Sequence, residues 1–249
     1  MPNDDGDAAE RAVEDGSVTR SLQPMARRQT KPAIIDAALG LFEERGFEAT
    51  TMRAIAERAG VSVGNAYYYF ASKDELIQGF YDRAMEEHAA ASAERLAGLT
   101  DLTERIVAHA DSWFAALGRY HQFATQFFRV ASDPSSPLSP FSSRSAPARE
   151  AAIAGWRDVV EGARTGDGSP AVADRLRSEL PELLWLYHLG LILFWVHDGS
   201  ADQAASRLVL AGTAPVIVRA IGLADVPELA ATIDDLARLV ATIRPMLAT

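Results

Sequence analysis

The sequence contains no cysteine among its 249 residues. This absence excludes disulfide bonds, thiolate nucleophiles, and zinc or iron–sulfur sites held by cysteine. Histidine is also scarce, and no two of the five histidines are spaced one helical turn apart, as ligands on a single metal-binding helix would be. We therefore expect no metal site and no cofactor.

Long apolar runs are missing as well. The first thirty residues hold no apolar stretch of the length that a secretory signal requires. The longest run, residues 183–196, is interrupted by His188 and is shorter than the roughly 20 residues needed to cross a bilayer. This run favours a buried helix, and the sequence as a whole favours a cytoplasmic protein without a membrane partner.

Positive charge is in deficit, with a net charge of −10, but the deficit is uneven along the chain. Residues 26–83 hold as many basic as acidic side chains, whereas the segments before and after them are acidic. A non-specific architectural DNA-binding protein would require a basic chain, which excludes that class here. If the protein has a nucleic-acid surface, we expect it within residues 26–83.

The remaining pattern is helical almost throughout, which predicts an all-α fold. Residues 1–26 are acidic and without apolar period, and predict a disordered tail. Residues 27–75 predict a small helical domain, and residues 76–249 a larger helical bundle. Apart from the small domain, helices are expected at about 72–96, 101–118, 120–131, 147–164, 171–198, 202–222 and 227–247.

Three short helices make up the small domain. An apolar stripe from Ile34 to Phe42 marks the first helix, which Gly46 ends. Thr50 or Thr51 caps a second helix, and Ser62 caps a third that runs to Tyr69. A capping box, Ser72-Lys73-Asp74-Glu75, opens the long fourth helix.

The second and third helices are joined by a turn containing Gly60, the arrangement of a helix-turn-helix. A recognition helix reaches base edges in the DNA major groove from its N-terminal turn. Here that turn carries the small residues Ser62, Val63 and Gly64, which let the backbone approach closely. Asn65 can pair with both hydrogen-bonding groups of adenine in that groove, and the Val63 methyl groups can meet thymine. The hydroxyls of Tyr67 and Tyr68 can reach phosphates.

This segment resembles the DNA-binding domain of the TetR (TetR/AcrR) family of bacterial transcriptional regulators. The resemblance spans about fifty residues without a gap. It is carried by Phe42, Gly46, Phe47, Ala49, Thr50, Thr51, Met52, Arg53, Ile55, Ala56, Ala59, Gly60, Val61, Ser62, Gly64, Tyr67, Tyr69, Phe70, Ser72, Lys73 and Leu76.

The resemblance implies a role for each matching residue. Thr51 and Arg53 would touch the DNA backbone or adjacent bases. Bases would be met by Ser62, Val63, Gly64 and Asn65, although relatives often carry a polar or basic residue at the position of Val63. Phosphates would be held by Tyr67, Tyr68 and Lys73, one of only two lysines in the chain.

Other residues near this segment allow two interpretations. Tyr69 and Phe70 are better explained as core residues than as contacts to DNA. Arg58 lies where it can either neutralise the C-terminal end of its helix or contact phosphate. The short basic run Arg27, Arg28 and Lys31 can form an arm that enters the minor groove.

In the larger domain, the resemblance implies dimerisation and binding of a small effector. The late helices 182–196 and 201–221 are apolar on more than one side, which suits a four-helix interface between two copies. A stripe of Ala205, Leu208 and Gly212 lets a partner helix approach closely. The alternative is that both helices are central to their own subunit.

Aromatic residues concentrate in the same domain and predict an apolar ligand pocket, with a hydrophobic or aromatic effector. Each of them taken singly is also explained as a core residue. The candidate pocket residues are Trp113, Phe114, Phe127, Trp156, Trp185 and His188.

An enzyme is the competing class, but the sequence has no phosphate-binding loop, no His-Glu-x-x-His and no Gly-x-Ser-x-Gly. Residues 166–171 fit a dinucleotide-binding fingerprint formally, yet they follow a helix and contain Pro170, so we interpret them as a loop. The favoured function is a homodimeric repressor that binds a palindromic operator in double-stranded DNA and is released by a small hydrophobic or aromatic molecule. A ligand-independent or activating regulator is the alternative, and an enzyme acting on an apolar molecule is a weaker one.

Overall fold

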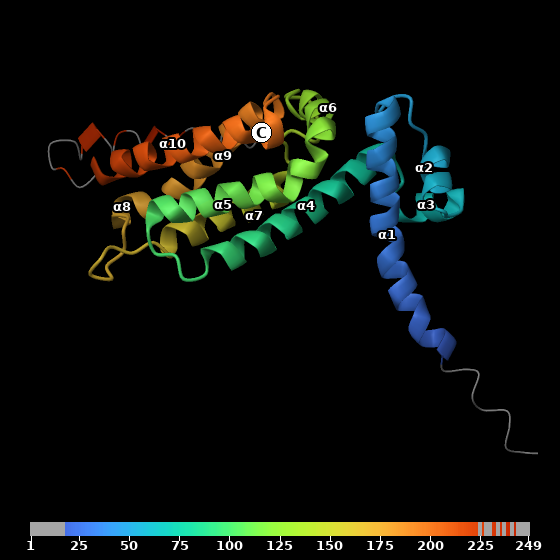
Figure 1. Ribbon diagram of the computed structural model, residues 1–249, viewed down its shortest axis with the longest axis horizontal. Coiled ribbons are helices and arrows are strands. Elements are labelled where there is room, and N and C mark those ends of the chain that lie inside the picture. The colour runs from blue at the N-terminus through green and yellow to red at the C-terminus, as the bar shows by residue number, and fades with distance from the viewer. Residues whose placement is uncertain are drawn as a thin grey trace, which may run out of the picture. The chain divides into compact units, whose positions relative to one another are not determined.

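The computed structural model describes residues 18–223 and positions 226, 231, 232, 235, 238, 239 and 242; its side-chain description begins at Thr30 and omits positions 122, 126, 129 and 130. All regular elements in this part of the chain are helices, which confirms the all-α class (Figure 1). The predicted helix at 227–247, apart from isolated positions, and the predicted tail up to residue 17 lie outside the described residues.

The chain divides into two compact units, with the boundary between Gly79 and Phe80 inside a long helix. The sequence places this boundary after residue 75. The smaller unit holds α1 (Val18–Arg45), α2 (Met52–Arg58), α3 (Val63–Tyr69) and the start of α4 (Lys73–Leu96). The larger unit continues with α5 (Leu102–Leu117), η1 (Gly118–Tyr120), α6 (His121–Ala131), α7 (Ala146–Glu161), α8 (Asp174–Arg177), α9 (Leu180–Val196), η2 (Ala201–Gln203) and α10 (Ala204–Gly222).

The first helix is longer than the apolar pattern predicts. It begins at Val18 rather than near Thr30, so the backbone of 18–26 is helical and does not belong to a disordered tail. This stretch has no apolar stripe and contains Pro24, a residue of very low helix propensity. A search for apolar periodicity therefore overlooks it.

The predicted apolar stripe forms the core of the smaller unit. Ile34, Leu41 and Phe42 of α1 are almost completely buried, as is Ile55 of α2. The helices α1 and α2 pack against each other, and α2 packs against α3. The unit is thus a compact three-helix domain with α3 at its surface.

Both predicted N-caps of the short helices are present. The Thr51 side chain accepts a hydrogen bond from the Ala54 amide at 3.2 Å, and Ser62 accepts one from the Asn65 amide at 3.1 Å. Gly60, between α2 and α3, has φ +68°, a left-handed conformation that favours glycine. These local rules set the start of α3 and the tight turn before it.

In the larger unit, α5 packs against α7 and α10, and α9 packs against α6, α7 and α10 (Figure 1). Trp156, Trp195 and Phe114 are fully buried between these helices. The predicted helix at 171–198 is two helices, α8 and α9, because Pro181 lies in the first turn of α9, where proline starts a helix rather than continuing one.

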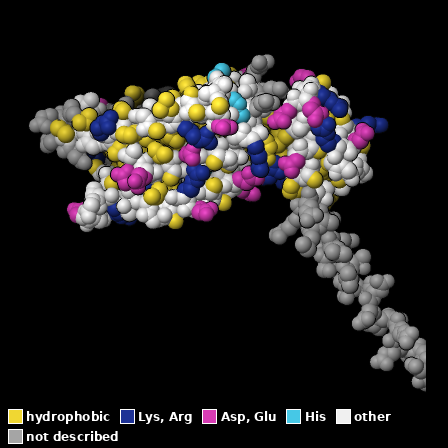
Figure 2. All heavy atoms as spheres, viewed as in Figure 1, with side chains coloured by type: hydrophobic (Ala, Val, Ile, Leu, Met, Phe, Trp, Pro, Cys, Tyr) yellow, Lys and Arg dark blue, Asp and Glu magenta, His cyan; other side chains and the backbone are white. Residues whose placement is uncertain are grey.

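One segment, Ala201–Gly222, is long and apolar enough to cross a membrane by length and composition alone. Only 17% of an 18-residue apolar stretch within this segment is buried inside the structure. Hydrophobic side chains gather over the part of the larger unit where α10 and α5 lie in Figure 1, between scattered charged groups (Figure 2). The last described helix therefore offers an apolar surface that the other described residues of its unit do not bury.

Candidate nucleic-acid interface and ligand cavity

The outer face of α3 is the first candidate site. Tyr67 and Tyr68 are 50% and 70% exposed, and Asn65 is exposed beside them. A side chain at Gly64 would meet nothing within 4 Å, so packing inside the protein does not require glycine at this position. Large aromatic side chains left in solvent beside an open backbone suit contact with another molecule.

Most of the residues predicted to face DNA are exposed to solvent. Thr51, Ser62 and Arg53 are exposed near the starts of α2 and α3, and Val63 is half-buried. The Thr51 and Ser62 hydroxyls already accept hydrogen bonds as N-caps, but each retains a proton that it can donate. Arg53 makes no hydrogen bond or ion pair to any described residue.

Lys73 is held by the protein itself. Its Nζ atom donates to the carbonyl oxygen of Phe47 at 2.6 Å, reaches that of Glu48 at 3.4 Å, and lies 4.3 Å from the centre of the Phe47 ring. An ammonium group has three protons to donate, so one remains for a phosphate. The structure thus adds a structural role for Lys73, and its contact with phosphate stays a prediction.

The structure separates the alternatives for the neighbouring residues. Arg58 forms a bidentate ion pair with Glu44 of α1, with one bond of 2.8 Å, and the hydrogen bond from Arg58 lowers the pKa of Glu44. Phe70 is buried and belongs to the core, whereas Tyr69 is half-buried and packs edge-on against Tyr68. The backbone of Arg27 and Arg28 is part of α1, and their side chains lie outside the described residues.

The second candidate site is a cavity of about 930 Å³ in the larger unit. This volume lies within the range of pockets that hold drug-sized ligands. Its walls come from α4, α5, η1, α6, α9 and the loop between α6 and α7. The helices contribute Phe80, Tyr81, Ala84, Met85, Trp113, Leu117, Tyr120, Phe123, Ala124, Phe127, Phe128, Ala131, Leu186, Leu189, Gly190, Ile192, Leu193, Trp195 and Val196.

The cavity includes only two of the predicted pocket residues, Trp113 and Phe127. Phe114, Trp156, Trp185 and His188 do not line it, because they are buried in contacts between helices. The apolar character of an aromatic side chain predicts that it is buried. It does not show whether the ring packs in the core or faces a cavity.

The four prolines and six serines of residues 133–147 predict a mobile loop, and in the structure this α6–α7 loop forms one wall of the cavity. The amides of Ser136, Ser139 and Ser142 donate to the carbonyls of Asp133, Ser136 and Ser139, each at 3.0 Å. Each of these three consecutive turns has proline at its second position, which proline favours. The triplet pattern Asp/Ser-Pro-x was the sequence signal for this ordered wall.

A buried cluster of three histidines does not line the cavity, although the His188 ring packs edge-on against the lining residue Trp113, with ring centres 5.6 Å apart. The rings of His88, His109 and His188 have centres 4.7 to 6.1 Å apart. His109 and His88 share hydrogen bonds with Ser92 and Ser112, whereas Nε2 of His188 has no partner among the described residues. Burial lowers the pKa of His88 to about 4 and that of His188 to about 3, so both are neutral at pH 7.

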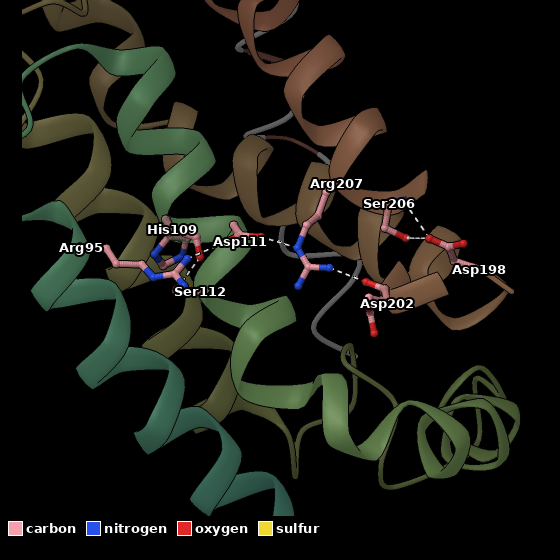
Figure 3. A network of polar contacts seen from close by, with 8 residues as sticks. All are labelled: Arg95, His109, Asp111, Ser112, Asp198, Asp202, Ser206 and Arg207. Atoms are coloured by element: carbon pink, nitrogen blue, oxygen red, sulfur yellow. Dashed lines mark hydrogen bonds and ion pairs between the residues drawn. The ribbon is translucent and has the colours of Figure 1, made fainter. Parts of the chain in front are cut away.

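A polar network connects three helices at the surface of the larger unit (Figure 3). Arg95 of α4 and Arg207 of α10 both bind the carboxylate of Asp111 on α5, at 2.6 and 2.9 Å. Nearby, the buried carboxylate of Asp198 accepts hydrogen bonds from the amide and hydroxyl of Ser206, both at 2.7 Å. These contacts fix the start of α10 against the rest of the unit.

The predicted dimer stripe lies on the open side of α10. Leu208 is 75% exposed and Gly212 is exposed, with nothing within 4 Å of the position that a side chain would take. Ala205 is half-buried, and Val216, one turn beyond Gly212, is 53% exposed. The interpretation that α10 is wholly central to its own subunit is therefore wrong.

Comparison with known proteins decides the family. The sequence profile described as "Bacterial regulatory proteins, tetR family" matches residues 34–79. A second profile, "Tetracyclin repressor-like, C-terminal domain", matches residues 105–239, more than half of the chain. The chain belongs to the TetR family. The first match covers the helix-turn-helix, and the second covers most of the cavity and the stripe on α10.

Individual TetR-family proteins are similar over different lengths. The HTH-type transcriptional repressor KstR2 of Mycobacterium tuberculosis is 42% identical over 76 residues, 26% of this chain and 38% of that protein. The chain thus spans well under half of this relative. A TetR regulator from Nitrosomonas europaea superposes with a TM-score of 0.57 at 23% identity, over 76% of this chain and 97% of that one.

A further TetR-fold structure, the regulator FadR of Bacillus subtilis in complex with stearoyl-CoA, has a TM-score of 0.56 at 17% identity. The superposition covers 73% of this chain and 96% of that one. At this identity the likeness shows the fold alone. The two-domain helical architecture is therefore that of the TetR family.

Proposed function

We propose that the protein is a transcriptional repressor that inserts α3 into the DNA major groove, in the bacterial cytoplasm. The observation that carries the proposal is the solvent-exposed face of α3, which presents Gly64, Asn65, Tyr67 and Tyr68. Membership of the TetR family and the repressor names of its relatives support it. Asn65 would read a base, and the tyrosines would contact phosphates.

The DNA-bound form in this proposal is a homodimer. One α3 helix reaches one half-site only, so specific binding requires two copies with their α3 helices at a fixed separation. The exposed apolar stripe through Leu208, Gly212 and Val216 on α10 supports an interface there. Burying such a stripe against its copy removes apolar surface from water at both subunits.

Control by a small effector is the third part of the proposal. The cavity of about 930 Å³ with aromatic walls supports a largely apolar ligand. FadR, which shares the fold, binds stearoyl-CoA, an apolar chain on a charged carrier. Release from DNA then requires that the ligand bind the DNA-free form more tightly than the DNA-bound form.

Arg53→Ala tests the DNA surface, with Arg157→Ala as its control. Both arginines are exposed on helices, but Arg157 lies on α7 in the larger unit. We expect Arg53→Ala to weaken binding to all sequences and to lower the salt slope by about one unit. Arg157→Ala should leave both unchanged. Fluorescence anisotropy with labelled duplex DNA at several salt concentrations measures both quantities.

Asn65→Ala separates base recognition from backbone contact. It should weaken binding to the preferred operator by about 1–3 kcal/mol and relax the preference at one position of each half-site, with the salt slope kept. Equal effects of Arg53→Ala and Arg157→Ala, together with an unchanged preference in Asn65→Ala, would place the DNA surface elsewhere.

A further inference from the structure

We propose that the cavity of the larger unit takes amphipathic ligands whose anionic group binds Arg144 and whose hydrocarbon or aromatic body lies between α4, α5, α6 and α9. The inference rests on the proposed effector role and names the chemical class of the effector. Nothing in an apolar cavity by itself requires a charged ligand, but the polar groups of this cavity are unevenly distributed over its wall.

The wall is chemically divided. Its helical part is almost entirely apolar and includes the rings of Trp113, Phe123 and Phe127. Its polar hydroxyls, apart from two tyrosines, come from the loop between α6 and α7, which contributes Ser132, Ser135, Ser136, Ser139, Ser142 and Ser143. A ligand that fills this space meets apolar surface on one side and hydrogen-bonding groups on the other.

Arg144 belongs to the same loop, is exposed, and is the one charged residue among the described residues that line the cavity. It makes no hydrogen bond or ion pair to the described residues. The nearby Arg149 behaves differently, because it donates to the carbonyls of Pro140 and Ser142 at 2.8 and 3.3 Å and holds the loop. The loop is thus fixed by one arginine and leaves the other free to bind a ligand.

A guanidinium group offers five N–H donors and no acceptor, and it matches the geometry of carboxylate and phosphate. Among the described residues no Asp or Glu lines the cavity, so none of them repels a ligand anion there. The same absence leaves a cationic ligand without a counter-charge and places it beside Arg144. Charge complementarity therefore favours an anion over a neutral or cationic ligand.

Tyr81 and Tyr120 are the two tyrosines of the helical wall, and the Tyr120 hydroxyl already accepts a hydrogen bond from Arg83. Burial raises the pKa of Tyr81 to about 12, so the phenol keeps its proton at pH 7. The hydroxyl has no hydrogen-bond partner among the described residues and can bind a ligand oxygen. This group orients a ligand but adds no negative charge opposite Arg144.

Binding to the DNA-free protein tests the inference. Trp113 and Trp195 line the cavity and report on occupancy through their fluorescence. The probes are hexadecanoate, the neutral hexadecan-1-ol, and hexadecanoyl-coenzyme A, which presents phosphates instead of a carboxylate. We expect hexadecanoate or its thioester to bind at least about tenfold more tightly than the alcohol, as a charge-assisted hydrogen bond provides.

Three variants assign that preference to its residue. Arg144→Met should remove the preference for the anionic probe and leave the affinity for the alcohol unchanged, whereas Arg144→Lys should retain most of it. Arg157→Met, at an exposed arginine outside the cavity, should behave like the unaltered protein. A response confined to the thioester would identify phosphate, rather than carboxylate, as the bound anion.

Equal affinity for acid, thioester and alcohol would overturn the inference, as would an unchanged preference in Arg144→Met or no binding of any anionic probe. Operator release is measured separately, by adding the bound probe to the protein–DNA complex. Anion binding without release would contradict the proposed effector role and leave the Arg144 site standing. Release by the alcohol alone, independent of Arg144, would support effector control and contradict the anion site.

Discussion

At the scale of single residues, the histidine cluster makes the stability of the fold depend on pH. His88, His109 and His188 are buried and have pKa values lowered by that burial. In the unfolded chain their pKa returns to about 6.5. As the pH falls below that value, the unfolded state takes up protons that the folded state excludes. The stability is therefore complete above about pH 6.5 and is lost as the pH falls towards 4.

His188→Leu tests this linkage. The substitution removes an Nε2 atom that has no hydrogen-bond partner, so stability at pH 7 should change little or rise. The slope of the unfolding free energy between pH 6 and 5 should fall by up to about 1.4 kcal/mol per pH unit, the contribution of one proton. Urea titrations at a series of pH values give this slope. A loss of several kcal/mol at pH 7 would show that the ring makes an essential contact.

Some roles of single residues can be predicted from the sequence, and others cannot. The caps Thr51 and Ser62 follow from residue type and position alone, and both are present. Residue type does not show which aromatic rings face the cavity. Phe114 and Phe127 have the same side chain, yet only Phe127 lines the cavity, because their tertiary surroundings differ. Lys73 shows the same limit, since its contacts with the carbonyls of Phe47 and Glu48 join residues far apart in sequence.

At the scale of elements, periodicity located most helices within a few residues. The errors have distinct physical causes. The start of α1 at Val18 has no apolar stripe and includes Pro24, so periodicity missed it. The prediction of one helix at 171–198 did not take account of Pro181, which lies in the first turn of α9. The α6–α7 loop was identified as a loop, but its series of proline turns was not.

The start of α10 depends on one buried carboxylate. Asp198 lies before the helix and accepts hydrogen bonds from Ser200 and from the amide and hydroxyl of Ser206. Burial raises the pKa of Asp198, but these hydrogen bonds outweigh it and hold the pKa well below the usual range. The group is therefore charged at neutral pH and bound on both oxygens.

Asp198→Asn replaces one accepting oxygen with a donor that faces other donors. We expect a loss of about 1–3 kcal/mol in unfolding free energy, measured by chemical denaturation at pH 7. Asp202→Asn is the matched control, because the Asp202 side chain has no such partners and asparagine tolerates its positive φ of 52°. If the two variants lose equal stability, Asp198 does not fix the start of α10.

At the scale of the whole molecule, the proposed function requires two copies. Gly212→Arg places a long charged side chain in the exposed stripe of α10, where it would meet its own copy across a symmetric interface. We expect sedimentation to show a folded monomer with unchanged helical circular dichroism and much weaker operator binding. Ala89→Arg adds the same charge to an exposed position of α4 and should leave a dimer. A Gly212→Arg protein that stays dimeric would move the interface to another surface.

The most direct test of the account is to select DNA from a random library with the purified full-length protein and to sequence what it retains. The account predicts an inverted repeat whose half-sites are centred about 10–10.5 base pairs apart or a multiple of that, and a change at one position of each half-site when Asn65→Ala is used. Retention without sequence preference, or of a single half-site unaffected by Asn65→Ala, would contradict a dimer that reads its operator through α3.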